Sequence, residues 1–157
     1  MEFRKANKAD IQELVGIRLA YLSEDFEGMT KEQMDALCEQ LPCYYEEHLE
    51  KDFIAYIAME KESIVASVFL VILEKPANPT FLTGKIGNIL NVYTKPEYRM
   101  RGLAGKLMDM AMKDAKGLNL SYLDLMATKA GYPLYIKKGF SDFESKSKQM
   151  RIDIAMD

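Results

Sequence analysis

The sequence contains one basic, glycine-bearing loop directly before a predicted helix. It reads Arg99-Met100-Arg101-Gly102-Leu103-Ala104-Gly105 and follows a predicted strand over residues 86–94. The first turn of a helix has backbone N–H groups without partners and a partial positive charge, so an anion is stabilised there. Glycine lets the backbone approach such an anion closely, because it has no Cβ. The loop therefore predicts a phosphate-binding site.

This loop differs from the common nucleotide-binding loops. It lacks the Gly-x-Gly-x-x-Gly pattern of dinucleotide sites. Lys106 follows Gly105, but Leu107 comes next, where a P-loop needs a serine or threonine for magnesium. ATP or GTP turnover is therefore disfavoured. A phosphate-bearing ligand bound without phosphoryl transfer remains, and so does a plain turn between a strand and a helix.

A second motif, Leu134-Tyr135-x-x-x-Gly139-Phe140, lies nearer the C-terminus. Tyrosine can donate a proton to a leaving group whose pKa approaches its own. Taken alone, however, Leu134 and Phe140 are core residues, Gly139 ends a helix, and Tyr135 is an ordinary half-buried tyrosine. The motif gains meaning only together with the phosphate loop.

Hydrophobic patterning predicts the elements that must position both motifs. Strands are expected over residues 2–5, 53–59, 64–73, 86–94 and 122–127, with a last pair over 140–145 and 149–154. Helices are expected over residues 9–22, 30–50, 102–116 and 130–138. A helix between two strands makes those strands parallel, whereas hairpins make the others antiparallel.

Three local signals refine these elements. Thr30 and Gln33 are spaced as a capping box that starts the second helix. Pro42 has no backbone N–H and is expected to kink or break that helix, which resumes over residues 44–50. The adjoining Ile89 and Leu90 interrupt the alternation of their strand, which indicates either a bulge or burial on both faces.

Composition limits the classes of function. The 157 residues suit a single domain spanning 1–157, and the net charge of −3 argues against a nucleic-acid partner. The longest apolar run, residues 64–73, is too short for a membrane span, and the charged N-terminus favours a cytoplasmic location. Cys38, Cys43 and His48 lie in one predicted helical stretch without a second ligand cluster, so no metal is expected.

Together, Arg99-x-x-Gly102-x-Ala104 and Leu134-Tyr135-x-x-x-Gly139-Phe140 resemble the GNAT superfamily of acyl-CoA-dependent N-acetyltransferases. The resemblance covers nearly the whole chain and is most specific from Asn91 to Phe140. It implies an α/β fold with a mixed, mostly antiparallel central sheet flanked by helices. Its parallel central strands would splay apart at the cofactor site. Homodimers are common in this family, so a homodimer is one expectation.

The resemblance implies acetyl-CoA as cosubstrate and places its contacts. Backbone groups of the loop would hold the diphosphate; these residues are Met100, Arg101, Gly102, Leu103, Ala104 and Gly105. Side chains of Arg99, Arg101 and Lys106 would either meet the phosphates or lie in solvent. The strand residues that would bind the pantetheine arm are Val92, Tyr93 and Thr94. Thr128 stands where the family often has an asparagine that touches this arm, and Gly131 replaces a common alanine.

The implied reaction is direct attack of a primary amine, from a small molecule or a peptide, on the thioester. A backbone N–H near Val92 would stabilise the oxyanion, and Tyr135 would protonate the departing thiolate or merely contact the sulfur. No glutamate lies on the strand over 86–94, where Asn91 can orient a water but accept no proton. Residues that could instead serve as a base or attract a cationic amine are Glu24, Asp25 and Glu27, although such a charge run also suits a solvated turn.

Two rival functions stay open at this point. The scaffold could use another acyl donor or another nucleophile. It could also be a non-catalytic module that binds or senses acyl-CoA. The lack of a glutamate on the strand over 86–94, where some family members have one, favours this second alternative. Turnover of an amine separates the enzyme from the binding module.

Overall fold

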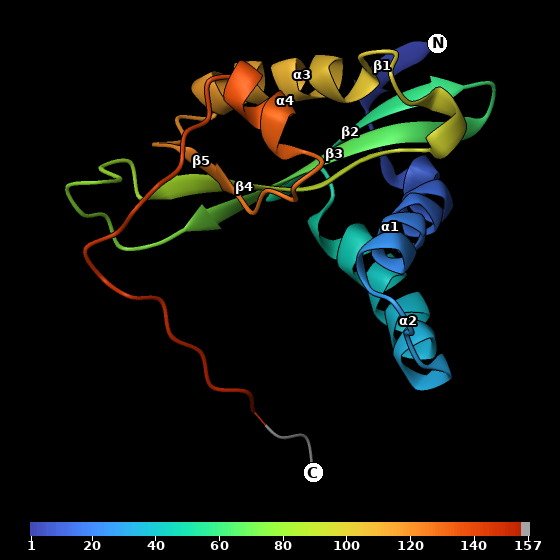
Figure 1. Cartoon of the computed structure of the whole chain (residues 1–157), viewed down its shortest axis with the longest axis horizontal. Coiled ribbons are helices and arrows are strands. Elements are labelled where there is room, and N and C mark those ends of the chain that lie inside the picture. The colour runs from blue at the N-terminus through green and yellow to red at the C-terminus, as the bar shows by residue number, and fades with distance from the viewer. Residues whose placement is uncertain (155–157) are drawn as a thin grey trace.

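A computed structural model describes residues 1–154. Five strands form one sheet in the order β1-β2-β3-β4-β5 (Figure 1); they are β1 (Glu2–Lys5), β2 (Phe53–Glu60), β3 (Ser63–Glu74), β4 (Lys85–Thr94) and β5 (Leu123–Leu125). The helices are α1 (Ile11–Asp25), α2 (Lys31–His48), α3 (Leu103–Gly117) and α4 (Tyr132–Lys137), with short 3₁₀ turns η1 (Lys8–Asp10) and η2 (Pro96–Tyr98). β1 to β4 pair antiparallel and β5 is parallel to β4, which confirms the expected mixed α/β fold.

The helices cover both faces of the sheet. Helices α1 and α2 lie on one face, and α3 and α4 lie on the other (Figure 1). Alternate residues of β2 serve the two cores: Ala55 and Ile57 pack with the α1–α2 layer, whereas Tyr56 and Ala58 pack with the α3 layer. No helix within residues 1–154 is both long enough and apolar enough to cross a membrane.

Strand β4 contains the irregularity on which the site depends. Its register with β3 shifts by one residue between the pairs Ser67–Tyr93 and Phe69–Leu90, and the extra residue is accommodated at Asn91, whose φ is 52°. Of the two expectations for Ile89 and Leu90, a bulge or burial on both faces, the structure has the bulge, immediately after Leu90. The ladder to β5 ends at Ile89, so β4 continues to Thr94 with no strand of residues 1–154 on that side.

Helix α2 corrects the expectation for Pro42. The helix runs unbroken from Lys31 to His48 with Pro42 inside it, and its capping box at Thr30 and Gln33 is formed as expected. Leu41 and Tyr45, on either side of the proline, are both buried in the core. The helix is therefore not broken at Pro42, and the burial of these two neighbours offsets the lost hydrogen bond.

The acidic segment after α1 and the C-terminal segment also differ from expectation. Helix α1 continues to Asp25, so the loop that follows it is shorter than the expected loop over residues 23–30.

The last two strands, expected over 140–145 and 149–154, do not form. The chain there leaves the body of the protein as an extended segment (Figure 1). Apolar side chains along this segment are exposed, namely Phe143, Met150, Ile152 and Ile154. A strand needs a pairing edge, which this segment does not reach.

Gly87 permits the close approach of β4 to the residues around β5. A Cβ at this position would lie 2.5 Å from Leu123 Cδ2 and 2.7 Å from Leu70 Cδ1. We therefore predict that Gly87→Ala lowers the free energy of unfolding by about 1–3 kcal/mol, because the packed side chains must move. Urea denaturation measures the change.

Gly16 provides the matched control for this substitution. It lies inside α1, and a Cβ there meets nothing within 4 Å. Gly16→Ala should raise the free energy of unfolding by about 0.8–1 kcal/mol through helix propensity alone. Equal effects of the two substitutions would contradict the packing argument at Gly87.

Candidate active site

The phosphate loop leads into α3 through two left-handed residues. Met100 has φ 63° and Gly102, the N-cap of α3, has φ 73°. No side chain caps the helix, and the first backbone bond runs from Lys106 N to Gly102 O at 3.1 Å. Within residues 1–154, the backbone N–H groups from 100 to 105 donate to no acceptor. These groups are free to bind an anion at the positive end of the helix.

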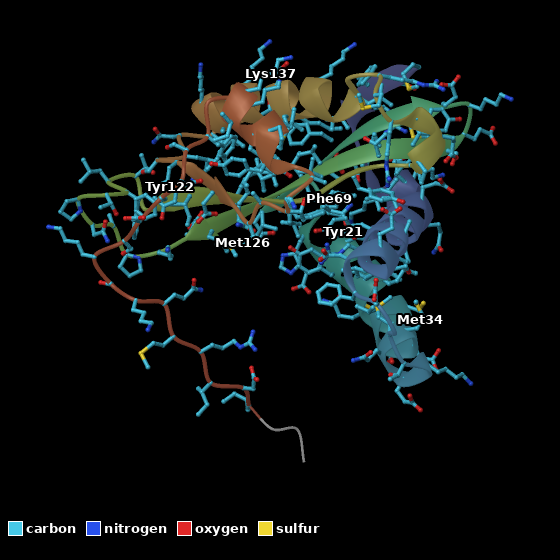
Figure 2. The ribbon with its side chains drawn as sticks, in the orientation of Figure 1. Tyr21, Met34, Phe69, Tyr122, Met126 and Lys137 are labelled. Atoms are coloured by element: carbon cyan, nitrogen blue, oxygen red, sulfur yellow. The ribbon has the colours of Figure 1, made fainter. Side chains whose placement is uncertain are left out.

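A cavity of about 330 Å³ opens at this helix end. It is lined by Gly102, Gly105, Lys106, Asp109, Leu134, Lys137 and Lys138. Lys138 pairs with Asp109, and the Lys106 ammonium lies 3.7 Å from the centroid of the Phe3 ring. Lys137, on α4, is exposed (Figure 2) and forms no ion pair with any residue in the described range. The two lysines of α4 were not identified from the sequence, although they follow directly on Tyr135-Ile136.

Arg99 contacts helix α1 across the sheet edge. Its Nη2 donates to both carboxylate oxygens of Glu24, at 2.8 and 3.0 Å, and its Nε donates to the Thr94 carbonyl at 2.9 Å. The Tyr93 hydroxyl donates to the same carboxylate at 2.8 Å. Hydrogen bonds from Tyr93 and Arg99 lower the pKa of Glu24. The structure therefore places the Arg99 guanidinium on Glu24, where it links α1 to the end of β4.

The remaining charged candidates lie around this link. Arg101 donates to the Glu97 carbonyl at 3.0 Å and lies over the Tyr98 ring. Asp25 and Glu27 are exposed at the end of α1 and in the loop after it. Of the three acidic candidates, only Glu24 is brought into contact with the predicted cofactor strand, through Tyr93.

Tyr135 projects from α4 into the core beneath α3. It packs among Leu103, Leu107 and Ile89, and its ring meets Phe140 edge-on at 6.1 Å. Burial raises the pKa of Tyr135 to about 12, with a smaller contribution from Tyr21 on α1. Its hydroxyl has no hydrogen-bond partner within residues 1–154 and is not sealed from solvent. It is thus a protonated phenol available to a ligand.

The glycine at position 131 is explained by this tyrosine. A Cβ on Gly131 would lie 2.9 Å from Tyr135 Cε2 and 3.1 Å from its hydroxyl oxygen. The Gly131 N–H donates to Thr128 Oγ1 at 3.1 Å. Gly131 therefore makes room for the Tyr135 ring, and the Thr128 hydroxyl bonds the turn before α4.

Asn91 braces the bulge of β4 from inside the protein. It is 1% exposed. Its Nδ2 donates to Ser67 Oγ at 2.9 Å, and its Oδ1 accepts from Arg18 Nη1 at 3.2 Å. Ser67 Oγ in turn donates to the Asn91 carbonyl at 3.3 Å. The bulge is thereby tied to β3 on one side and to α1 on the other.

The side chains that could bind a metal ion do not cluster within residues 1–154. No group of three or more His, Cys, Asp or Glu side chains in residues 1–154 is placed to hold an ion. Cys38 and Cys43 are free, exposed thiols on α2.

Comparison with known proteins agrees with this geometry. A family model for the acetyltransferase (GNAT) domain matches residues 51–142, more than half of the chain. This chain belongs to the GNAT acetyltransferase family. The match contains β2 to β5, the phosphate loop and α4. The open strand edge, the free helix end and the buried tyrosine thus lie within the GNAT domain.

Solved structures share the fold over almost their whole length. A predicted acetyltransferase from Clostridium acetobutylicum, whose crystal structure was determined with acetyl-CoA, is 31% identical and has a TM-score of 0.82; the match covers 96% of this chain and 95% of that chain. A GCN5-related N-acetyltransferase from Ralstonia eutropha JMP134 is 26% identical, with a TM-score of 0.73 and coverage of 95% and 97%. Glucosamine-6-phosphate N-acetyltransferase from Arabidopsis thaliana, at 21% identity and TM-score 0.64, shares the fold over 95% and 97%. No curated protein matched the sequence.

The left-handed backbone of Asn91 in the β4 bulge can be tested by substitution. Asn91→Gly and Asn91→Ala both remove the bonds to Ser67 and Arg18, but only alanine must hold a Cβ at φ 52°. The left-handed conformation costs a residue other than glycine about 1–2 kcal/mol. We predict that the alanine variant is less stable than the glycine variant by about 1 kcal/mol in urea denaturation. Equal stabilities would show that the bulge relaxes.

Proposed function

We propose that this GNAT protein transfers the acetyl group of acetyl-CoA to a primary amine of a small molecule or peptide. The observation that carries the proposal is the combination of free N–H groups at the start of α3 with the unpaired edge of β4. Tyr135 belongs to the same hydrophobic cluster as Leu103 at the start of α3, and Val92 of β4 packs against this cluster. The donor is supported by the Clostridium acetobutylicum relative, whose structure was determined with acetyl-CoA.

The residues present fit each part of acetyl-CoA. Backbone N–H groups of residues 100–105 would bind the diphosphate. The edge of β4 from Val92 to Thr94 would bind the pantetheine arm as an added strand, since no strand pairs there. Lysines that line the cavity at the helix end would meet the remaining phosphate; they are Lys106, Lys137 and Lys138.

The chemistry follows from these positions. The amine nitrogen attacks the thioester carbonyl, a C–N bond forms, and the oxyanion is stabilised by the N–H near Val92. As the C–S bond breaks, the thiolate takes the Tyr135 proton, and the proton that the nitrogen releases returns to the phenolate through water, which restores the phenol. Because the pKa of Tyr135 is about 12, the phenol stays protonated at neutral pH. Glu24, with its lowered pKa and its bonds to Arg99 and Tyr93, is a poor base.

Tyr135→Phe tests the role of the phenol. We predict that kcat falls by about 10²- to 10⁴-fold, whereas the Kd for acetyl-CoA, measured by calorimetry, changes little. Tyr132→Phe is the matched control, because this neighbouring α4 tyrosine is 41% exposed and bonds only to Asp142. The wild-type rate should rise with pH as the amine loses its proton, with no decline from Tyr135 until the pH nears 12.

Two results would contradict parts of this proposal, the first the role of Tyr135 and the second the transfer of acetyl itself. Unchanged turnover in Tyr135→Phe would remove the acid role while leaving acetyl transfer intact. Acetyl-CoA binding without thiol release in the presence of any amine would favour the binding module, which the absence of a carboxylate on β4 otherwise supports.

Lys137→Ala tests the lysines at the helix end. Lys137 is exposed, so its loss should weaken acetyl-CoA binding only about two- to fivefold at about 0.05 M salt, and less at about 0.5 M. Lys116→Ala at the other end of α3 removes the same charge away from the cavity and should leave the Kd unchanged. A loss equal in both variants, or independent of salt, would place the phosphates elsewhere.

A further inference from the structure

A second cavity, which we call the aromatic cavity, lies on the α1–α2 face of the sheet. Its volume is about 180 Å³, and it is lined by Arg18, Gln40, Leu41, Tyr44, Tyr45, Phe53, Phe69, Val71 and Leu90. Figure 2 labels Phe69 and Tyr21 where this helical layer meets the sheet. The cavity is separated by the sheet from the lysine-lined cavity at the start of α3 (Figure 1). It is therefore a different compartment from the one that fits the phosphates.

Aromatic rings form much of the wall of the aromatic cavity, beside the polar side chains of Arg18 and Gln40. Phe53 meets Phe69 edge-on at 5.1 Å and Tyr44 edge-on at 5.4 Å, and Tyr45 stands edge-on to Phe69 at 6.2 Å. Burial raises the pKa of both Tyr44 and Tyr45, so both phenols remain neutral. Such walls favour an apolar or aromatic body over a charged one.

Arg18 is the one charged side chain that lines this cavity. It is half-buried, and no carboxylate within residues 1–154 pairs with it. Its Nη1 donates to Asn91 Oδ1 at 3.2 Å, and its guanidinium lies 5.8 Å from the centroid of the Tyr21 ring. The other N–H groups of this planar cation form no hydrogen bond within residues 1–154, and a carboxylate fits them in a bidentate manner.

The aromatic cavity adjoins the reacting end of the proposed site. Leu90 lines it and immediately precedes the bulge, and Asn91 bonds Arg18 one residue before Val92. Tyr21 meets the Tyr93 ring edge-on at 6.1 Å and contributes to the raised pKa of Tyr135. An acceptor held by Arg18 would thus have its amine close to the strand edge where the thioester is expected.

We propose that the acceptor is an amine that carries a carboxylate and an apolar body, in the manner of an aromatic α-amino acid. This inference rests on the proposed function. Arg18 would bind the carboxylate, and the aromatic cavity would hold the side chain. Glu24, at the acidic end of α1, does not oppose this choice, because Arg99 neutralises its charge and Tyr93 donates a hydrogen bond to it.

Acceptor preference tests the proposal without any variant. Thiol release from acetyl-CoA is measured with phenylalanine, with phenylalanine amide, which lacks the negative charge, and with lysine methyl ester as a cationic amine. Phenylalanine should be used with a kcat/KM about 10- to 100-fold above that of the amide, as one charge-assisted pair predicts. If the amide or the cationic ester has a kcat/KM equal to or above that of phenylalanine, the proposed carboxylate-bearing acceptor is wrong, whereas the proposed acetyl transfer still holds.

The substitution Arg18→Gln tests the proposed contact between Arg18 and the acceptor carboxylate. It also removes the bond to Asn91, so both acceptors lose some turnover, but kcat/KM for phenylalanine should fall about 10- to 100-fold further than kcat/KM for the amide. Arg18→Lys, which keeps the charge, should recover part of the loss, and Arg151→Gln, on the exposed C-terminal segment, should lose nothing. An equal loss for both acceptors would overturn the carboxylate contact. Absence of turnover with every amine would contradict the proposed function, and this inference with it.

Discussion

The site depends on one backbone constraint. Beyond Ile89, β4 pairs with β3 along one edge, and no strand within residues 1–154 covers its other edge. The extra residue at Asn91 turns the strand out of register with β3, and β5 ends before it can cover the exposed edge. Unpaired backbone groups on a strand edge must find another partner, and a ligand with amide groups can supply it. Asn91 keeps this arrangement in place because its buried side chain bonds Ser67 and Arg18 at once.

Charge around this edge is divided between the two faces of the sheet. Free N–H groups and three lysines lie at the start of α3, where phosphates would bind. On the opposite face of the sheet, Arg18 is the one charged side chain that lines the aromatic cavity. Between them, Arg99 and Tyr93 hold Glu24, so the end of α1 is fixed to the end of β4. The proposed donor and acceptor compartments would thereby both adjoin β4.

Local patterns predicted much of this structure. The phosphate loop and the buried stripe of α3 follow from glycines and helical spacing, which act over a few residues, and the parallel pairing of β5 follows from the intervening helix. Non-local effects were missed. Pro42 is tolerated because tertiary burial of its neighbours outweighs its cost, and the last strands fail because pairing needs an edge from elsewhere in the chain. The Glu24–Arg99 link and the Arg18–Asn91 bond join distant positions, so no spacing rule reports them.

Backbone amide NMR during an acetyl-CoA titration tests the central claim most directly. The account predicts that amide resonances of residues 100–105 and of Val92 to Thr94 shift together and saturate at one Kd. Amides around Met34, at the end of α2 that extends away from the sheet (Figure 2), should stay unchanged. Saturable binding that leaves residues 100–105 unshifted, or a titration with no shifts at all, would contradict the phosphate site and the acetyltransferase mechanism built on it.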